Sequence, residues 1–189
     1  MEALNTTLLE ARPAKPAVTT LRPPTGTELL VAAGGFFALG VTASLGSGSL
    51  ETVGHNLPGT LFTSIGALVL TGPALLVVHQ FLRLDATPQA LATALGRGFH
   101  VSGRLALGLS APMLFFSATS ALWTTLLTFA LFAIGLMGLS ATASYLVQVE
   151  SDATDRLTNR THMVVLSLAW CVLTALTALR IALDALLFA

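Results

Sequence analysis

Four long segments of this chain contain no Asp, Glu, Lys or Arg and consist mainly of aliphatic and small residues. They are residues 29–50, 57–82, 105–149 and 163–179. A helix needs about 20 mostly apolar residues to cross the hydrocarbon core of a bilayer. The first, second and fourth segments therefore each predict one membrane-crossing helix.

The third segment, with 45 residues, is too long for one crossing. As a single helix it would measure roughly 68 Å, about twice the thickness of the bilayer core. The stretch FSATSALWTT, residues 116–125, contains small hydroxyl residues that permit a turn and a Trp suited to the membrane interface. We therefore predict a reversal there and five helices in all, near residues 29–46, 59–82, 104–119, 123–147 and 163–187.

The composition agrees with a membrane protein. Charged residues make up 10% of the chain, against about 25% in an ordinary soluble domain. The mean hydropathy is +0.81. The net charge is zero and no dense basic block is present, which argues against a nucleic-acid partner. We predict an all-α integral membrane protein with a leader, residues 1–28, and a transmembrane domain, residues 29–189.

The basic residues alternate between the connections of the predicted helices. Three precede the first helix, three lie between the second and third, two lie between the fourth and fifth, and the other two connections have none. Cytoplasmic loops carry an excess of Lys and Arg. This partition predicts a multi-pass protein of the inner (cytoplasmic) membrane with its N-terminus in the cytoplasm and its C-terminus outside.

The leader contains the proline-rich stretch ARPAKPAVTTLRPPTG. Proline fixes φ and removes a backbone donor, so this stretch cannot form a helix or a central strand. It is either a solvated tail or an extended arm that docks on a partner. We predict that residues 12–26 bind a neighbouring protein in an extended form.

The segment LDATPQALATALGRGFH separates the second and third predicted helices. Thr87 is a good N-cap, Pro88 fits the first helical position, and Gly96 can end a helix. We predict a short interfacial helix on the cytoplasmic surface, although an ordinary connecting helix explains the same pattern. Three arginines would then face anionic lipid headgroups: Arg83, Arg97 and Arg104.

Pro73 and Pro112 fall inside predicted helices and should kink them. In transporters such breaks expose backbone carbonyls to a substrate. That alternative would use three hydroxyls as pore groups: Thr63, Thr71 and Ser110. Four small residues suit close packing between helices of this chain: Gly34, Ala38, Gly135 and Gly138.

His79, His100 and His162 fall at the cytoplasmic ends of predicted helices. Three imidazoles at one depth raise the alternative of a metal or haem site in a redox subunit. No carboxylate stands at metal-ligand spacing from them in the sequence. We therefore expect no metal site and no cofactor. No nucleophile elbow, phosphate-binding loop or zinc-protease helix is present, so we assign no catalytic residue and predict no enzyme.

The last helix ends in LTALRIALDALLFA, where Arg180 and Asp184 interrupt an aliphatic run. Arg180 is 17 residues from Met163, or about 26 Å along a helix, and so lies near the outer surface of the bilayer. The two charges then mark the end of the span. The alternative is a partner contact or an intramembrane polar contact, because Thr177 shares one helical face with Arg180 and Asp184.

Three stretches carry a family resemblance: NLPGTLFTSIGALVLTGPALLVVHQFLRL, LALGLSAPMLFFSATSALWTTLLTFALFAIGLMGL and AWCVLTALTALRIAL. From the first to the last they span residues 56–183, about two-thirds of the chain. They resemble a poorly characterised bacterial multi-pass family similar in layout to Yip1-domain proteins. The resemblance implies a five-helix membrane bundle without established catalysis, and it supplies no catalytic residues.

The functional expectation is a non-enzymatic membrane subunit or scaffold within a larger assembly. Its partners would be membrane lipids and other membrane proteins. The first alternative is a transporter or channel component that uses the two proline-containing helices. The second alternative is a haem-binding or other redox membrane subunit.

Overall fold

The computed structural model describes residues 21–45, 50–154 and 156–187, and its account of side chains omits residues 50–62, 123–124 and 182–187. Over this part of the chain the secondary structure is entirely α-helical, with no strand. All or part of each helix is long and apolar enough to cross a membrane. The five helices are α1 (Gly26–Leu45), α2 (Leu50–Phe81), α3 (Pro88–Thr119), α4 (Trp123–Ala153) and α5 (Leu157–Leu187).

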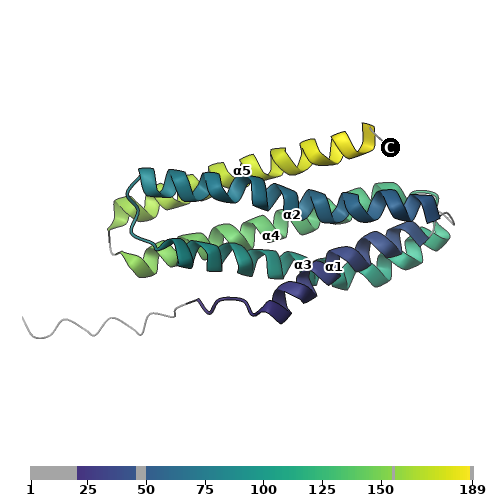
Figure 1. Ribbon diagram of the computed structural model, residues 1–189, viewed down its shortest axis with the longest axis horizontal. Coiled ribbons are helices and arrows are strands. Elements are labelled where there is room, and N and C mark those ends of the chain that lie inside the picture. The colour runs from purple at the N-terminus through teal and green to yellow at the C-terminus, as the bar shows by residue number, and fades with distance from the viewer. Residues whose placement is uncertain (1–20, 46–49, 155, 188–189) are drawn as a thin grey trace, which may run out of the picture.

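The helices form an elongated bundle in which successive helices run in opposite directions (Figure 1). Neighbours along the chain are not always neighbours in space. Helix α1 packs on α3, α3 on α4, α4 on α5, α5 on α2, and α2 on α1, whereas α2 and α3 meet at only a few points. The order of packing is therefore a ring in which α2 and α3 are separated by α1.

The predicted helix on the cytoplasmic surface is the first part of α3. Thr87 is the N-cap, with its side chain accepting a 3.2 Å hydrogen bond from the backbone N–H of Ala90, and Pro88 follows in the first turn, as predicted. The predicted end at Gly96 is wrong, because α3 continues to Thr119. A single glycine costs only about 1 kcal/mol inside a helix, and packing of this face against α1 and α4 outweighs that cost.

The predicted reversal within the long uncharged segment is confirmed. Helix α3 ends at Thr119 and α4 begins at Trp123. The backbone N–H of Ser120 donates to the Phe116 carbonyl at 2.9 Å, and the Ser120 hydroxyl accepts from the N–H of Leu122 at 3.1 Å. The small hydroxyl residue closes one helix and positions the next, as expected for a turn residue.

The connection between α4 and α5 is shorter than the apolar pattern predicts. Helix α4 continues to Ala153 and α5 already begins at Leu157, rather than near residues 147 and 163. A hydropathy pattern marks the part of a helix that fits the hydrocarbon core. It does not mark the end of the helix, because α-helical hydrogen bonds continue outside the membrane.

Glycines bring α1 and α3 into backbone contact. A Cβ at Gly35 would overlap the Gly103 carbonyl, and one at Gly103 would overlap Ala32. Such close approach is the usual function of small residues between membrane helices, where dispersion contacts replace the hydrophobic effect as the source of affinity. The pair fixes how closely these two helices approach.

Glycines also allow α3 and α4 to approach closely. A Cβ at Gly98 would overlap the Thr142 side chain, and one at Gly138 would overlap Ser102. The predicted packing position Gly138 is thus confirmed. Gly34 and Gly135 are not packing positions, because a Cβ at either would meet nothing within 4 Å. Helical spacing alone does not tell which of two adjacent residues faces the neighbouring helix.

Candidate functional site

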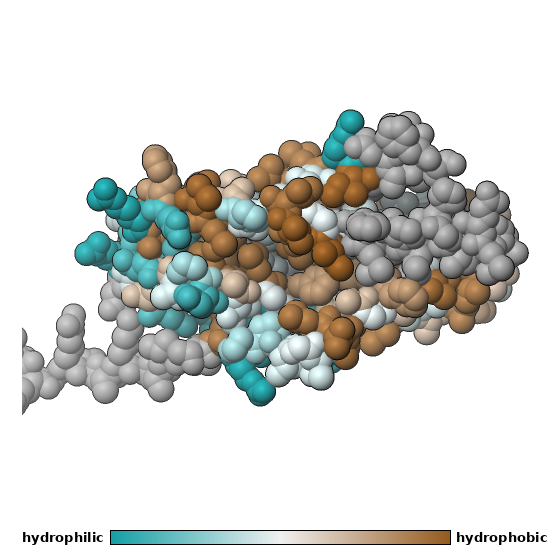
Figure 2. Space-filling view, in the orientation of Figure 1, coloured by the Kyte–Doolittle hydropathy of each residue, from teal (hydrophilic) through white to brown (hydrophobic). Residues whose placement is uncertain are grey.

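Hydrophilic residues gather at one end of the bundle, at the left in Figure 2. Figure 1 places the α2–α3 and α4–α5 connections at the same end. We call this region the polar end. Among the described residues, Glu150, His79 and Asn159 make polar contacts between helices and connections there, so it is the candidate functional region.

The centre of the polar end is the carboxylate of Glu150, near the end of α4, which is completely buried. Its Oε1 accepts a hydrogen bond from the backbone N–H of Asp85 at 3.0 Å. Its Oε2 accepts from the N–H of Ala86 at 3.1 Å and lies 3.3 Å from His79 Nε2. A buried carboxylate needs such partners, because an unpaired charge away from water is very costly. We call Glu150, His79 and the 85–86 backbone the Glu150 latch.

The latch holds a helix end of defined geometry. Arg83 has a positive φ of 52°, in the left-handed region. Its N–H donates to the Gln80 carbonyl at 3.0 Å, and the N–H of Leu84 donates to the His79 carbonyl at 3.3 Å. These two bonds form a Schellman motif, which commonly ends helices with glycine at the left-handed position. Here an arginine occupies that position, so the conformation depends on the contacts around it.

Two further contacts tie the α4–α5 connection to the same region. Asn159 donates from Nδ2 to Asp85 Oδ2 at 2.8 Å. Arg160 donates from Nη2 to the carbonyls of Ser151 and Thr154, each at 3.3 Å. A cation at these carbonyls complements the negative end of the α4 dipole. The hydrogen bond from Asn159, in the first turn of α5, therefore joins the start of α5 to the α2–α3 connection.

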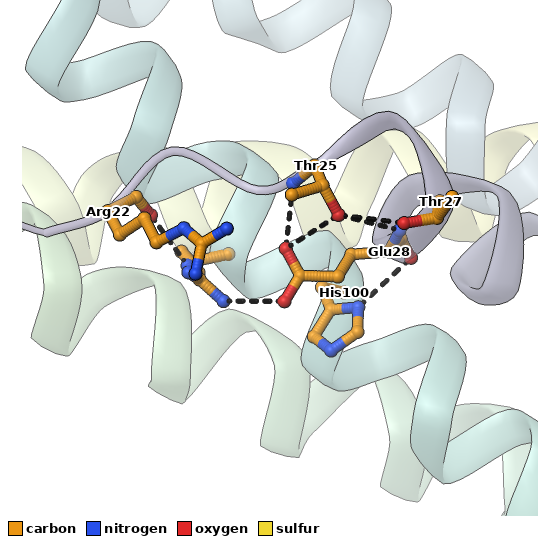
Figure 3. A network of polar contacts seen from close by, with 6 residues as sticks. Arg22, Thr25, Thr27, Glu28 and His100 are labelled. Atoms are coloured by element: carbon orange, nitrogen blue, oxygen red, sulfur yellow. Dashed lines mark hydrogen bonds and ion pairs between the residues drawn. The ribbon is translucent and has the colours of Figure 1, made fainter.

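A second polar network surrounds the start of α1 (Figure 3). Thr25 and Glu28 form a capping box: the N–H of Thr25 donates to Glu28 Oε2 at 2.7 Å, and the N–H of Glu28 donates to Thr25 Oγ1 at 3.3 Å. Arg97 of α3 lies with its Nη1 3.4 Å from Glu28 Oε1. Its Nε donates to the Arg22 carbonyl at 2.8 Å, and His100 Nδ1 lies 3.0 Å from the Glu28 carbonyl.

These contacts dock the end of the leader on the chain itself. A Cβ at Gly96 would lie 2.7 Å from Pro24 Cγ, so the proline covers this glycine closely. Leu21 packs against the core cluster that contains Leu75 and Leu91. Residues 21–25 are thus an arm fixed on α3. The rest of the predicted docking segment, residues 12–20, lies outside the described part of the chain, and its binding to another protein stays a prediction.

The three arginines assigned to headgroups differ in their surroundings. Arg83 and Arg104 are exposed. Arg97 is half-buried and uses its guanidinium to hold the arm. Contact with headgroups therefore stays a prediction, and of these three arginines Arg83 and Arg104 have exposed side chains.

A buried polar contact that the sequence analysis did not predict joins α2 and α5. In the middle of the α2–α5 interface, the Thr71 and Thr174 hydroxyls are 2.9 Å apart, and Trp170 Nε1 donates to the Thr71 carbonyl at 3.1 Å. All three residues are buried. The sequence signal for them was weak, because Thr and Trp are not charged and only the pairing of α2 with α5 brings them together.

Thr177, Arg180 and Asp184 are the residues predicted for a partner contact or an intramembrane polar contact. Thr177 donates to the Leu173 carbonyl of its own helix at 2.9 Å, and Arg180 is exposed. The Asp184 side chain lies outside the described part of the structure. The assignment of these residues to a partner contact therefore stays a prediction.

The three interfacial histidines do not converge. His79 faces Glu150, His100 contacts the Glu28 carbonyl, and His162 is exposed. The carboxylate beside His79 is 71 residues away in the sequence, so sequence spacing gave no sign of it. Among the residues that the structure describes, no group of three His, Cys, Asp or Glu side chains is placed to hold a metal ion.

The two helix-interior prolines and the proposed pore hydroxyls do not share a site. Pro73 and Pro112 are both exposed and lie within continuous helices, so the predicted kinks stay predictions. The Thr71 hydroxyl is buried against α5 and also donates to the Ala67 carbonyl, whereas Ser110 donates to the Leu107 carbonyl of α3. These hydroxyls serve helix packing and local bonding.

Comparison of the chain with protein-family models, with curated proteins and with solved structures found no match. The similarity in layout to Yip1-domain proteins accordingly stays a hypothesis based on the quoted stretches.

Proposed function

We propose that this protein is a non-enzymatic multi-pass subunit or scaffold of the inner membrane, and that its bundle presents the proline-rich leader to a partner protein. The observation that carries the proposal is the docked arm. Arg97 holds the Arg22 carbonyl and the Glu28 carboxylate, and Pro24 lies on Gly96. The leader therefore departs from a fixed point on α3 rather than from a free helix end.

Fixing one end of a binding segment favours association. A proline-rich segment loses little conformational entropy on docking, because its φ angles are already restricted. An anchored base restricts it further and sets the surface that it can reach. The buried polar groups at the polar end join helices and connections. Such contacts favour a rigid bundle, which suits a scaffold.

The proposal includes an N-terminus in the cytoplasm and a C-terminus outside. Its support is the partition of basic residues and the odd number of candidate spans in the described part of the chain, since an odd number of crossings leaves the two chain ends on opposite sides of a membrane. Reporter fusions after Gly48 and Ala189 should report outside, and fusions after Arg83 and Arg156 should report inside. An internal reporter within residues 97–99 is avoided, because Gly98 is buried against α4. A cytoplasmic reporter at Ala189 would refute this topology.

The partner test compares three forms of the full membrane domain. Deletion of residues 2–20 removes the first part of the leader but keeps Leu21 and Pro24, which contact the bundle. A second form replaces residues 2–20 by a Gly/Ser segment of equal length, which controls for chain length. In the third, Arg97→Gln weakens the anchor and keeps the leader sequence.

We expect a stoichiometric partner to co-purify with the wild type and to be lost from both leader variants. The thermal stability of the bundle should stay close to that of the wild type in those two, since the arm contacts are retained. Arg97→Gln should weaken partner retention at raised salt. Wild-type stoichiometry in the truncated form would contradict the role of the leader. Absence of any stoichiometric partner from the wild type would contradict the subunit proposal itself.

A further inference from the structure

An apolar groove lies where α2 and α3 fail to pack against each other. Its walls include Ala33 of α1, Ile65 and Val69 of α2, and Leu95 and Phe99 of α3. The volume is about 330 Å³, and nearly all of the lining surface is apolar. Val69 is 64% exposed, so the groove opens outward on its α2 side.

The groove belongs to the part of the molecule that faces lipid. Its α2 wall lies in the candidate span Thr63–Phe81, and Ala33 lies in the span Gly26–Leu45. The hydrocarbon region holds no water to fill an apolar furrow, and an empty one forfeits dispersion contacts along its whole lining. Either an acyl chain or a neighbouring helix must therefore occupy it.

The volume favours the acyl chain. A helix about 10 Å across occupies roughly 420 Å³ in each turn of 5.4 Å. The groove is smaller than one such turn, so a docked helix would leave most of its side chains outside. A single acyl chain is thin and flexible enough to follow the space between α2 and α3.

Positive charge lies at the α3 rim of the groove. Gly96, which also lines the groove, is covered by Pro24, and Arg97 follows directly. Arg97 holds the carbonyl of Arg22, whose own side chain is exposed. One acid, Glu28, pairs with Arg97, so these three charged residues leave the rim positive by one charge. An anionic headgroup complements this rim.

We propose that the groove binds one acyl chain of an anionic phospholipid, with the headgroup phosphate beside Arg22 and Arg97. The lipid would belong to the leaflet nearer the polar end, because the rim lies at the start of α1. Bound there, it would contact α1, α2 and α3 together and fill the space between α2 and α3. This inference depends on the membrane-embedded bundle and is independent of the partner proposal.

The experiment uses native mass spectrometry of the full chain extracted from nanodiscs that contain equal amounts of phosphatidylglycerol and phosphatidylethanolamine. The wild type should retain one phospholipid per monomer, with phosphatidylglycerol preferred. Two variants fill the groove: Ala33→Leu from α1 and Val69→Trp from the exposed α2 wall. The matched control is Gly34→Leu, since a Cβ at Gly34 faces open space.

We expect both groove variants to lose the retained lipid and the Gly34→Leu control to keep it. Arg22→Gln should keep the lipid but lower the preference for phosphatidylglycerol by about fivefold, the contribution of one basic residue near an anionic surface. Retention of the lipid by folded Val69→Trp would overturn the assignment of the groove, and so would a wild type that retains none. A wild-type dimer that Ala33→Leu dissociates would assign the groove to a second copy and overturn the proposal as well.

Discussion

Glu150→Ala should detach the α2–α3 connection from the bundle. The substitution leaves the backbone N–H groups of Asp85 and Ala86 without their acceptor and removes the partner of His79. Each unsatisfied buried donor costs about 1–3 kcal/mol, which gives roughly 2–6 kcal/mol for the two N–H groups. The connection lies at the end of the bundle, where water can reach a displaced backbone. We therefore expect a loss of about 2–4 kcal/mol.

Glu150→Gln tests which feature of the carboxylate matters. The amide keeps one oxygen that can accept from a backbone N–H, but its NH₂ group faces the second donor. We expect roughly half of the loss seen with alanine, about 1–2 kcal/mol. Asp152→Ala is the matched control, because it removes a partly exposed carboxylate two residues further along α4. Its effect should stay within about 0.5 kcal/mol.

The chain offers two direct readouts. Its single cysteine, Cys171, is half-buried and donates to the Leu139 carbonyl at 3.6 Å, so a thiol-reactive dye follows unfolding in detergent. Arg83 lies in the connection itself, so trypsin cleavage after Arg83 follows its local release. We expect Glu150→Ala to lower the unfolding temperature and to speed cleavage at Arg83 relative to Asp152→Ala. Equal melting and equal cleavage in the two variants would refute the latch.

Two further predictions concern the helix interfaces. Gly103→Ala should force α1 away from α3 and destabilise the bundle by about 1–3 kcal/mol. Gly34→Ala, the control, should be neutral or slightly stabilising, because a Cβ there meets nothing within 4 Å. Equal melting temperatures of the two variants would contradict the assigned packing face. Trp170→Phe should lower the free energy of unfolding by about 0.5–1.5 kcal/mol, because it removes the hydrogen bond to the Thr71 carbonyl. A double-mutant cycle of Thr71→Val with Thr174→Val should show a coupling energy of about 0.6 kcal/mol between the two hydroxyls. A coupling energy of zero would mean that no hydrogen bond joins the Thr71 and Thr174 hydroxyls.

The positions of the helices follow from the sequence because the membrane imposes a simple rule on it. Backbone groups must be satisfied within a segment that meets lipid, so each long uncharged segment predicts a helix. This rule predicted the reversal near Ser120 and the span count, and local capping chemistry predicted Thr87 as an N-cap. Such features depend on residues that are adjacent in the chain.

The pairing of helices was decided only by the tertiary structure. Hydropathy is nearly uniform around a membrane helix, so it does not tell Gly34 from Gly35 or predict that α2 packs on α5. The contact between Glu150 and His79 joins residues 71 positions apart, and neither residue type signals the other. The sequence by itself thus determines which segments are helices long and apolar enough to cross a membrane, since lipid acts on each helix separately. Which buried polar groups meet depends on the mutual packing of all the helices, and the tertiary structure alone decides it.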